Sequence, residues 1–190
     1  MLRSISLACR LDSRTLNDIQ HHEADMSTLF AIALTTGILS GVWGWVAVSL
    51  GLLSWAGFLG CTSYFASPKD GLKGLGQSLL TNLSGVFWAM VIIHASQWVG
   101  LEIIGYVVTS IVAFMMCIQA KKSWLAYIPG TFIGSCATFA ANGDWQLVVP
   151  SLILGGLFGY LMKASGLWLY QKLNQPRTVQ TETASEIASR

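Results

Sequence analysis

The amino-acid sequence predicts an all-α membrane protein, a polytopic bundle of six transmembrane helices, and three observations support this prediction. Of the 190 residues, 53% are hydrophobic and only 11% are charged, whereas about 25% of the residues in a soluble domain are charged. The apolar residues form long continuous runs, without the period-two alternation of an outer-membrane β-strand. All 11 Lys and Arg residues fall on one side of the membrane when six apolar spans are drawn.

The charge-free run from residue 28 to residue 67 is too long to be one span. A single helix of this length would measure about 60 Å, twice the ~30 Å thickness of the hydrocarbon core, so the chain must turn back near Gly51. The expected spans cover residues 28–49, 52–67, 75–95, 103–120, 124–141 and 147–169. The chain thus divides into a polar extension (1–25), a transmembrane domain (26–172) and a cytoplasmic tail (173–190), which we expect to be disordered.

The basic residues predict the orientation of these spans. They precede the first span, lie between spans two and three and between spans four and five, or lie at the end of span six and beyond: Arg3, Arg10, Arg14, Lys69, Lys73, Lys121, Lys122, Lys163, Lys172, Arg177 and Arg190. The other three connections contain no basic residue. Because cytoplasmic loops collect Lys and Arg, we predict that both termini lie in the cytoplasm.

The extension over residues 1–25 does not match the spans in composition. Arg10 interrupts its one apolar stretch, and a secretory signal needs an uninterrupted apolar region of roughly 7–15 residues. The apolar pattern begins abruptly at Met26. The sequence therefore favours Met26 as the natural start of the protein over the alternative, a disordered cytoplasmic tail.

Several classes of function find no support in the sequence. The cysteines, which are Cys9, Cys61, Cys117 and Cys136, form neither a CxxC motif nor a Cys/His spacing, so we expect no metal site and no disulfide. We find no phosphate-binding loop, catalytic triad or haem motif, and we expect no cofactor and no enzymatic activity. The basic residues are spread over several loops, which predicts no nucleic-acid partner.

Uncharged polar residues inside the spans are the candidates for a solute path. The candidate path residues, which include two tryptophans within spans, are Thr36, Ser40, Trp43, Asn82, Ser84, Trp88, Thr131 and Ser135. Ser and Thr can bond to their own helix, whereas Asn82 needs a partner in the bundle or water. Spans one, three and five would then line a polar interior; interhelical hydrogen bonding without a path is the alternative.

His94 lies near the outer end of span three, within reach of Gln97 and Glu102 along the sequence. Because His titrates close to neutral pH, this group could form a proton-sensitive gate. The alternative is a histidine that simply lies at the membrane interface.

Small residues four positions apart predict close helix packing. The GxxxG pairs are Gly37 and Gly41, Gly130 and Gly134, and Gly155 and Gly159. Such pairs let two helix backbones approach each other, either within one bundle or between copies of the chain in a homo-oligomer.

A short motif, Leu-Ser-Gly-Val-aromatic, occurs at residues 39–43 and again at 83–87. With the Lys residues that follow the even-numbered spans, it suggests three repeated helix pairs, as in transporters built from parallel repeats. Chance recurrence of small and aromatic residues is the alternative explanation.

Several segments resemble the YcdZ-type bacterial inner-membrane proteins, a family of unknown function. These segments are residues 35–61, 88–93, 114–121, 129–134 and the Gly-Asp-Trp loop at 143–145. The resemblance covers about residues 26–169 and excludes residues 1–25. It implies an integral protein of the bacterial inner membrane and provides no catalytic or binding residues.

Two hypotheses follow. The first is a channel or transporter for a small uncharged solute, embedded in the lipid bilayer as a single bundle or a homo-oligomer. The second is a structural or accessory membrane protein that acts through helix–helix association. Neither requires a buried charge, and no acidic residue lies at the middle of a span.

Overall fold

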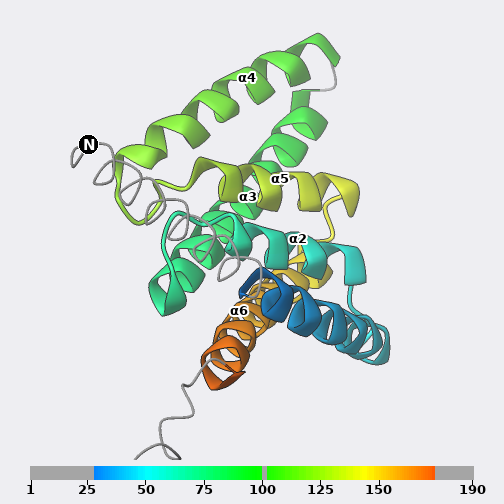
Figure 1. Ribbon diagram of the computed structural model, residues 1–190. Coiled ribbons are helices and arrows are strands. Elements are labelled where there is room, and N and C mark those ends of the chain that lie inside the picture. The colour runs from blue at the N-terminus through cyan, green and yellow to red at the C-terminus, as the bar shows by residue number, and fades with distance from the viewer. Residues whose placement is uncertain (1–27, 100–101, 174–190) are drawn as a thin grey trace, which may run out of the picture. The chain divides into compact units, whose positions relative to one another are not determined.

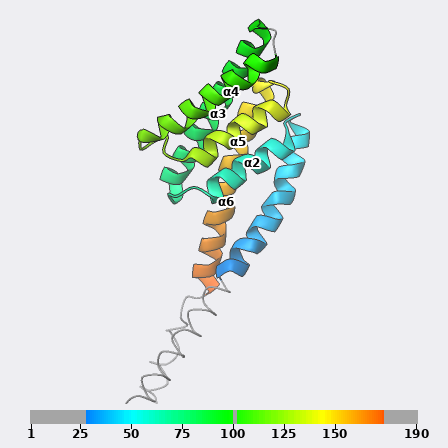
Figure 2. The same cartoon turned by 90° about the horizontal axis from the view of Figure 1, so that it is seen from above.

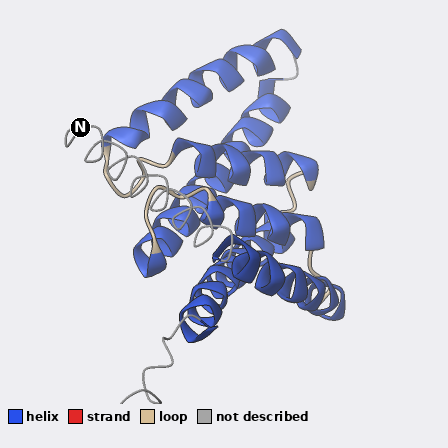
Figure 3. Cartoon of the chain, in the orientation of Figure 1, coloured by secondary structure: helices blue, strands red, loops and turns tan. Residues whose placement is uncertain are grey.

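Each expected span corresponds to one helix of the chain. The computed structural model describes residues 28–99 and 102–173, and all its regular elements are helical in this part of the chain (Figures 1 and 3). The helices are Thr28–Ser49, α2 (Ser54–Phe65), α3 (Gly71–Val99), α4 (Glu102–Ile118), the 3-10 turn η1 (Gln119–Lys121), α5 (Ile128–Ala140) and α6 (Trp145–Leu173). The predicted all-α class is therefore confirmed.

The expected extension at 1–25 and most of the tail at 173–190 lie outside the described residues. The chain divides into two compact units. One unit comprises residues 35–164, and the other contains the described segments 28–34 and 165–173. All side-chain contacts discussed below lie within the first unit.

Glycine and proline residues set several of the helix ends. Gly51, which follows the first helix, has φ +66°, and Gly143 has φ +83° in the turn before α6, a conformation that glycine adopts without a steric penalty. Pro129 lies in the first turn of α5, where its missing N–H group is not needed. The helix consequently begins at Ile128, four residues after the start of the expected span at Trp124.

The helices differ greatly in length. Three of them, Thr28–Ser49, Gly71–Gln97 within α3, and α6, are long and apolar enough to cross a membrane. By contrast, α2 has 12 residues and α5 has 13, which corresponds to about 18–20 Å, less than the ~30 Å hydrocarbon core. The two short helices lie side by side in both views (Figures 1 and 2).

The order of helix lengths reveals an internal repeat of three helices. Helices begin at residues 28, 54 and 71 in the first half and at 102, 128 and 145 in the second half, so the same two intervals recur. In each half a short helix is followed by a helix of 29 residues, α3 or α6. The repeat therefore has a period of three helices, whereas the sequence motif at 39–43 and 83–87 had suggested helix pairs.

Burial follows the same repeat residue by residue. In α2 and in residues 128–139 the order of buried, half-buried and exposed residues is identical over all twelve positions, so that Gly60 corresponds to Gly134. Residues 81–90 of α3 and 151–160 of α6 also share one pattern, in which Asn82 corresponds to Leu152. The two halves thus present the same faces to the interior.

Close backbone contacts show that the short helix of each half packs on the long helix of the other half. In the first half the short helix packs on the long helix of the other half, because a Cβ on Gly60 would collide with the carbonyl of Leu152 in α6. In the second half a Cβ on Gly134 would likewise collide with the carbonyl of Asn82 in α3. The repeat is therefore a pseudo-two-fold arrangement in which each short helix is held by the long helix of the opposite half.

The equivalent helices run in opposite directions. Tyr127, just before α5, lies beside Ser63, near the end of α2. Lys163, late in α6, forms an ion pair with Asp70, which precedes α3. The repeat is thus inverted, as in many transporters.

The inversion defines two ends of this unit. We call the end with the 66–70 loop, residues 121–127 and Lys163 the lysine end, because Gln77 in α3 bonds to Ser123 there and Asp70 pairs with Lys163. The end with the 50–53 and 141–144 loops is called the opposite end. Leu53 bonds to Ser151 early in α6 at that end, and Gly143 lies against Ile93 late in α3.

Candidate functional site

A group of fully buried polar side chains lies between α2, α3 and the start of α5, in the half nearer to the lysine end. We call it the polar cluster, and its members are Ser63, Ser78, Thr81, Asn82 and Tyr127. None of them is more than 4% exposed. Such burial of uncharged polar groups requires hydrogen-bond partners inside the bundle, since lipid provides none.

Three members form a chain of hydrogen bonds across two helices. The hydroxyl of Ser78 in α3 donates to Ser63 Oγ in α2 at 2.8 Å. Ser63 in turn donates to Asn82 Oδ1, also at 2.8 Å. Thr81 is satisfied locally, because its hydroxyl donates to the Gln77 carbonyl one turn earlier at 2.9 Å. Asn82 Oδ1 therefore accepts a hydrogen bond within the cluster, whereas the Asn82 Nδ2 donors form none.

Three buried polar atoms in and next to the cluster have no protein partner among the described residues. They are Asn82 Nδ2, Tyr127 Oη and Oε1 of the neighbouring Gln77, whose Nε2 donates to the Ser123 carbonyl at 3.2 Å. An unpaired buried polar group costs about 1–3 kcal/mol. The cluster therefore offers a donor and two acceptors to water or to a polar solute.

A second polar connection, the Gln119 bridge, links α3 to α5. Gln119 Oε1 accepts hydrogen bonds from Ser84 at 2.8 Å and from the Trp88 indole at 3.0 Å. Its Nε2 donates to Thr131 Oγ1 at 3.0 Å. Three of the predicted path residues, Ser84, Trp88 and Thr131, are thus brought together by a residue that the sequence pattern did not single out.

Four of the five positions equivalent to the polar cluster carry apolar side chains in the other half, and the fifth, Thr81, corresponds to the buried Ser151. Asn82 corresponds to Leu152, Ser78 to Val148, Ser63 to Ala137 and Tyr127 to Leu53. Ala137, Val148, Leu152 and Val86 form a buried hydrophobic group, against which Leu53 packs; we call these five residues the apolar cluster. One backbone arrangement therefore encloses the polar cluster near the lysine end and the apolar cluster near the opposite end, where the buried Ser151 hydroxyl accepts from Leu53 N–H and donates to the Leu147 carbonyl.

Trp43 contacts in the first half the equivalents of two residues that Gln119 contacts in the second, because Gly57 corresponds to Thr131 and Phe158 to Trp88. Its ring covers Gly57 and lies 5.3 Å from the ring of Phe158, and its indole N–H donates to the Ser54 carbonyl at 3.0 Å. Trp43 is only 1% exposed. It fills this part of the interior with an aromatic ring, whereas Gln119 places hydrogen-bonding groups there.

The remaining predicted residues do not join either polar connection. Thr36 and Ser40 are half-buried on the first helix, and Thr36 Oγ1 is buried without a partner among the described residues. Ser135 is buried on α5. His94 is exposed near the end of α3, while the side chain of Glu102 lies outside the described residues. The structure therefore does not gather the proposed gate around a buried histidine.

The GxxxG glycines divide into two groups. Gly130 and Gly134 lie against α3, and Gly155 and Gly159 lie against α2, so these four allow close contact between the two halves. Gly37 and Gly41 on the first helix are different, because a Cβ added to either would have no neighbouring atom within 4 Å.

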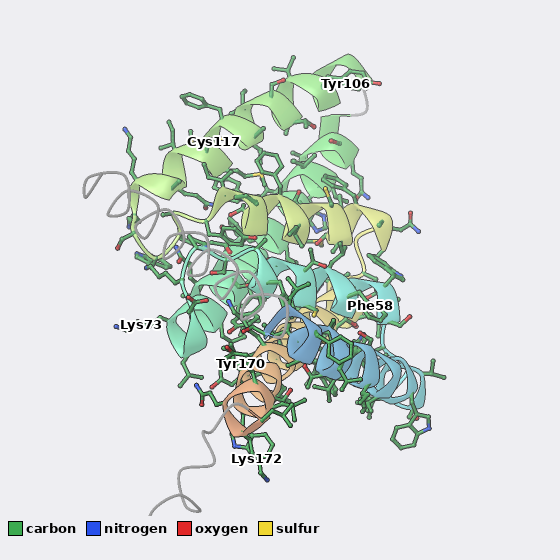
Figure 4. All side chains as sticks on the ribbon, in the orientation of Figure 1. Phe58, Lys73, Tyr106, Cys117, Tyr170 and Lys172 are labelled. Carbon is green, nitrogen blue, oxygen red and sulfur yellow. The ribbon has the colours of Figure 1, made fainter. Side chains whose placement is uncertain are left out.

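Charge and metal-binding groups are peripheral in the described part of the chain. All the buried polar side chains among residues 28–97 and 105–173, whose burial the structure describes, are uncharged. No group of three His, Cys, Asp or Glu residues able to hold a metal ion occurs in this part. On α4, Tyr106 and Cys117 are exposed (Figure 4), and Cys61, Cys117 and Cys136 are free thiols. The interior can thus form hydrogen bonds but has no fixed charge.

Long apolar helices around an uncharged polar interior define an integral membrane protein of the helical-bundle class. The chain belongs to a family of proteins of unknown function (DUF1097), whose pattern matches residues 33–167. This result agrees with the resemblance noted from the sequence.

Three relatives show how far the similarity extends. The chain is 70% identical over 145 residues to "Inner membrane protein YcdZ" of Escherichia coli (strain K12), which covers 76% of this chain and 89% of the relative. It is 66% identical over 151 residues to the Salmonella typhimurium protein of the same name, covering 79% and 94%. "Uncharacterized protein YahC" of Escherichia coli is 28% identical over 165 residues, covering 80% and 97%. No solved structure matches the chain. We conclude that it is an inner-membrane protein.

Proposed function

We propose that this protein conducts a small uncharged solute across the bacterial inner membrane as a channel or transporter. The observation that carries the proposal is the polar cluster with its unpaired groups, Asn82 Nδ2, Tyr127 Oη and Gln77 Oε1. An intramembrane polar group without a partner is costly, so a bundle that retains several of them has a use for them. A solute that passes through the bundle would complete these hydrogen bonds in transit.

The absence of buried charge in the described residues supports an uncharged solute. A charged solute in a low-dielectric interior needs a counter-charge, because the loss of hydration costs several kcal/mol per ion. The inverted repeat adds support, since transporters built from such repeats bind their solutes where the halves meet. The proposal includes no catalytic step and no cofactor.

We further propose that the lysine end faces the cytoplasm and that both termini lie there. Lys69, Lys121 and Lys163 share this end, as the positive-inside rule requires of a cytoplasmic face. A periplasm-reporting fusion after Asp144 should be active, and one after Lys122 should be silent. The reverse pattern would contradict the proposed orientation.

The transport proposal is tested with purified protein in proteoliposomes. Stopped-flow light scattering measures the entry of glycerol, urea and acetamide, three neutral solutes with hydrogen-bonding groups. We expect entry above the protein-free rate for at least one of them and a loss of this increment in Asn82→Leu. Ser110→Ala is the matched control, because the Ser110 hydroxyl is exposed and bonds only to the Tyr106 carbonyl of its own helix. Rates equal to the protein-free rate across the whole panel would refute the proposal.

The second candidate is an accessory protein that associates through the first helix. It is supported by the GxxxG pair Gly37 and Gly41, which has no neighbour within 4 Å and lies among exposed apolar residues such as Ile38 and Val42. Gly37→Leu should then remove a partner or a second copy that co-purifies in mild detergent. Gly76→Leu is the control, since Gly76 also has nothing within 4 Å but lies on α3. Purification of a single chain alone would count against this candidate.

A further inference from the structure

The inverted repeat gives the buried residues of α2 and of the middle of α3 structural equivalents in α5 and α6. The bonded polar chain Ser63, Ser78 and Asn82 corresponds to Ala137, Val148 and Leu152. Both sets are buried to the same degree: Asn82 is 1% and Leu152 is 0% exposed. The two sets therefore differ in chemistry and not in position or accessibility.

We infer that the apolar cluster is the barrier that limits the rate of solute passage at the opposite end, and that the polar cluster is the solute site. This inference rests on the proposed function. A hydrophobic constriction excludes water and polar solutes, and several channels are closed in this way. A neutral solute bonded to Asn82 would lose its hydrogen bonds to that amide on moving to Leu152, whose side chain offers none in their place. The binding of a neutral polar solute is thus favourable at the polar cluster and unfavourable at the apolar cluster.

The unpaired atoms define the class of solute. Asn82 Nδ2 needs an acceptor, and Tyr127 Oη and Gln77 Oε1 can accept hydrogen bonds. A small neutral molecule that carries both donors and acceptors, such as an amide or a polyol, matches this set. A purely apolar molecule would leave all three atoms unpaired.

The packing around Leu152 indicates how the barrier could be breached by substitution. The carbonyl of Leu152 lies against Gly60, as the carbonyl of Asn82 lies against Gly134. An asparagine is therefore accommodated at one of the two equivalent positions. Leu152→Asn places the same side chain at the other position and converts the centre of the barrier into a second polar site.

The experiment measures solute entry into proteoliposomes that contain wild-type protein or Leu152→Asn, with glycerol, urea and acetamide as probes. We expect Leu152→Asn to raise the entry rate at least tenfold above wild type. Met162→Asn is the matched control, because Met162 is also buried on α6 but lies outside both clusters. It should conduct at the wild-type rate, as should Leu152→Met, which keeps the barrier apolar.

A non-specific leak is distinguished by a double variant. If the solute passes through both clusters, adding Asn82→Leu to Leu152→Asn removes the gain. A gain that survives in the double variant, or one that also occurs in Met162→Asn, overturns the inference. Should Leu152→Asn fail to fold, Val148→Ser introduces a serine at the position equivalent to Ser78. This variant is also expected to raise the entry rate above wild type.

The outcome also separates the barrier from the proposed function. Solute entry that depends on Asn82 but is unchanged in folded Leu152→Asn would overturn the barrier and leave the proposed function standing. Entry that depends on Asn82 in the wild-type protein and rises in Leu152→Asn would support both the proposed function and the barrier. A wild-type rate equal to the protein-free rate would refute the proposed function even if Leu152→Asn conducts. No entry in either protein would refute both.

Discussion

The α5–α3 pair and the α2–α6 pair are built on one backbone plan and differ in what they enclose. In each pair a glycine of the short helix lies against a carbonyl of the long one, Gly134 against Asn82 and Gly60 against Leu152. The enclosed side chains are polar and hydrogen-bonded near the lysine end, whereas near the opposite end all of them but Ser151 are aliphatic at the equivalent positions. The comparison shows that small residues determine the packing of both pairs, while a few side chains determine their chemistry.

The largest expected effect tests whether the two pairs are equally dependent on their glycines. Gly60→Leu and Gly134→Leu each place a side chain against backbone that cannot move aside, and each should lower the free energy of unfolding by about 3 kcal/mol or more. Thermal unfolding in detergent, followed by circular dichroism, measures the change. Gly37→Leu should have little effect, because nothing lies within 4 Å of a Cβ at Gly37. A large loss of stability in only one of the two variants would show that the two helix pairs do not depend equally on their glycines.

A smaller effect is expected from removing the central hydroxyl of the polar cluster. Ser63→Ala leaves Ser78 Oγ without its acceptor and Asn82 Oδ1 without its donor, which should cost about 1–3 kcal/mol of stability. The loss should appear in the same unfolding measurement. Thr62→Ala, one residue away on the exposed face, removes a hydroxyl that bonds only within its helix and should change little. Equal stabilities for the two variants would show that the hydrogen-bonded chain is not needed.

The other chemical difference between the halves is that Gln119 places hydrogen-bonding groups where Trp43 places an aromatic ring, and a substitution of Gln119 tests it. Gln119→Leu removes hydrogen bonds to Ser84, Trp88 and Thr131. Because Gln119 is half-buried and water can replace some of these bonds, we expect a loss of about 1–2 kcal/mol. Thr109→Ala on the exposed face of α4 is the control. A gain in stability would mean that an apolar filling suits both halves equally.

The smallest effect concerns the ion pair that joins the two long helices at the lysine end. The side chain of Asp70 is 83% exposed and that of Lys163 is 28% exposed. Exposed pairs contribute at most about 1 kcal/mol, so Lys163→Ala should lower stability by less than this value. The difference from wild type should decrease in high salt, because screening weakens the pair. A loss that is independent of salt would point to packing of the Lys163 stem.

Much of this fold could be predicted from the sequence, because long charge-free runs specify membrane helices directly. The turn at Gly51 was found for the same reason. The start of α5 was misplaced, since residues 124–127 are not helical, and Pro129 marks the actual beginning. The three-helix repeat was missed because few residues are identical, among them Phe58 and Phe132. In addition, the sequence separation between equivalent residues is not constant. Between α3 and α6 it is shorter by about one helical turn than between α2 and α5, so no single alignment without gaps matches both pairs.

The polar site could be predicted only in part. Asn82 was selected because an amide inside a span cannot easily bond to its own helix. Ser63 and Ser78 were not selected, since only their arrangement in space distinguishes them from serines that bond to their own backbone. Gln119 lies at the junction of α4 and the basic loop, where a polar residue is unremarkable in the sequence. Its role depends on α5 folding back beside α3.

The inverted repeat also bears on the part that the lysines play in the proposed orientation. A repeat of three helices ends on the side of the membrane opposite to its start. The second repeat is therefore inserted in the opposite orientation to the first. Because α2 and α5, and the matching parts of α3 and α6, bury the same positions, the apolar pattern gives little information about the direction of insertion. The 66–70 loop contains Lys69, whereas the equivalent 141–144 loop of the second half contains no basic residue. In the proposed orientation, a few charges of this kind decide between two nearly equivalent insertion directions, and a variant that lacked them would be expected to insert in both directions.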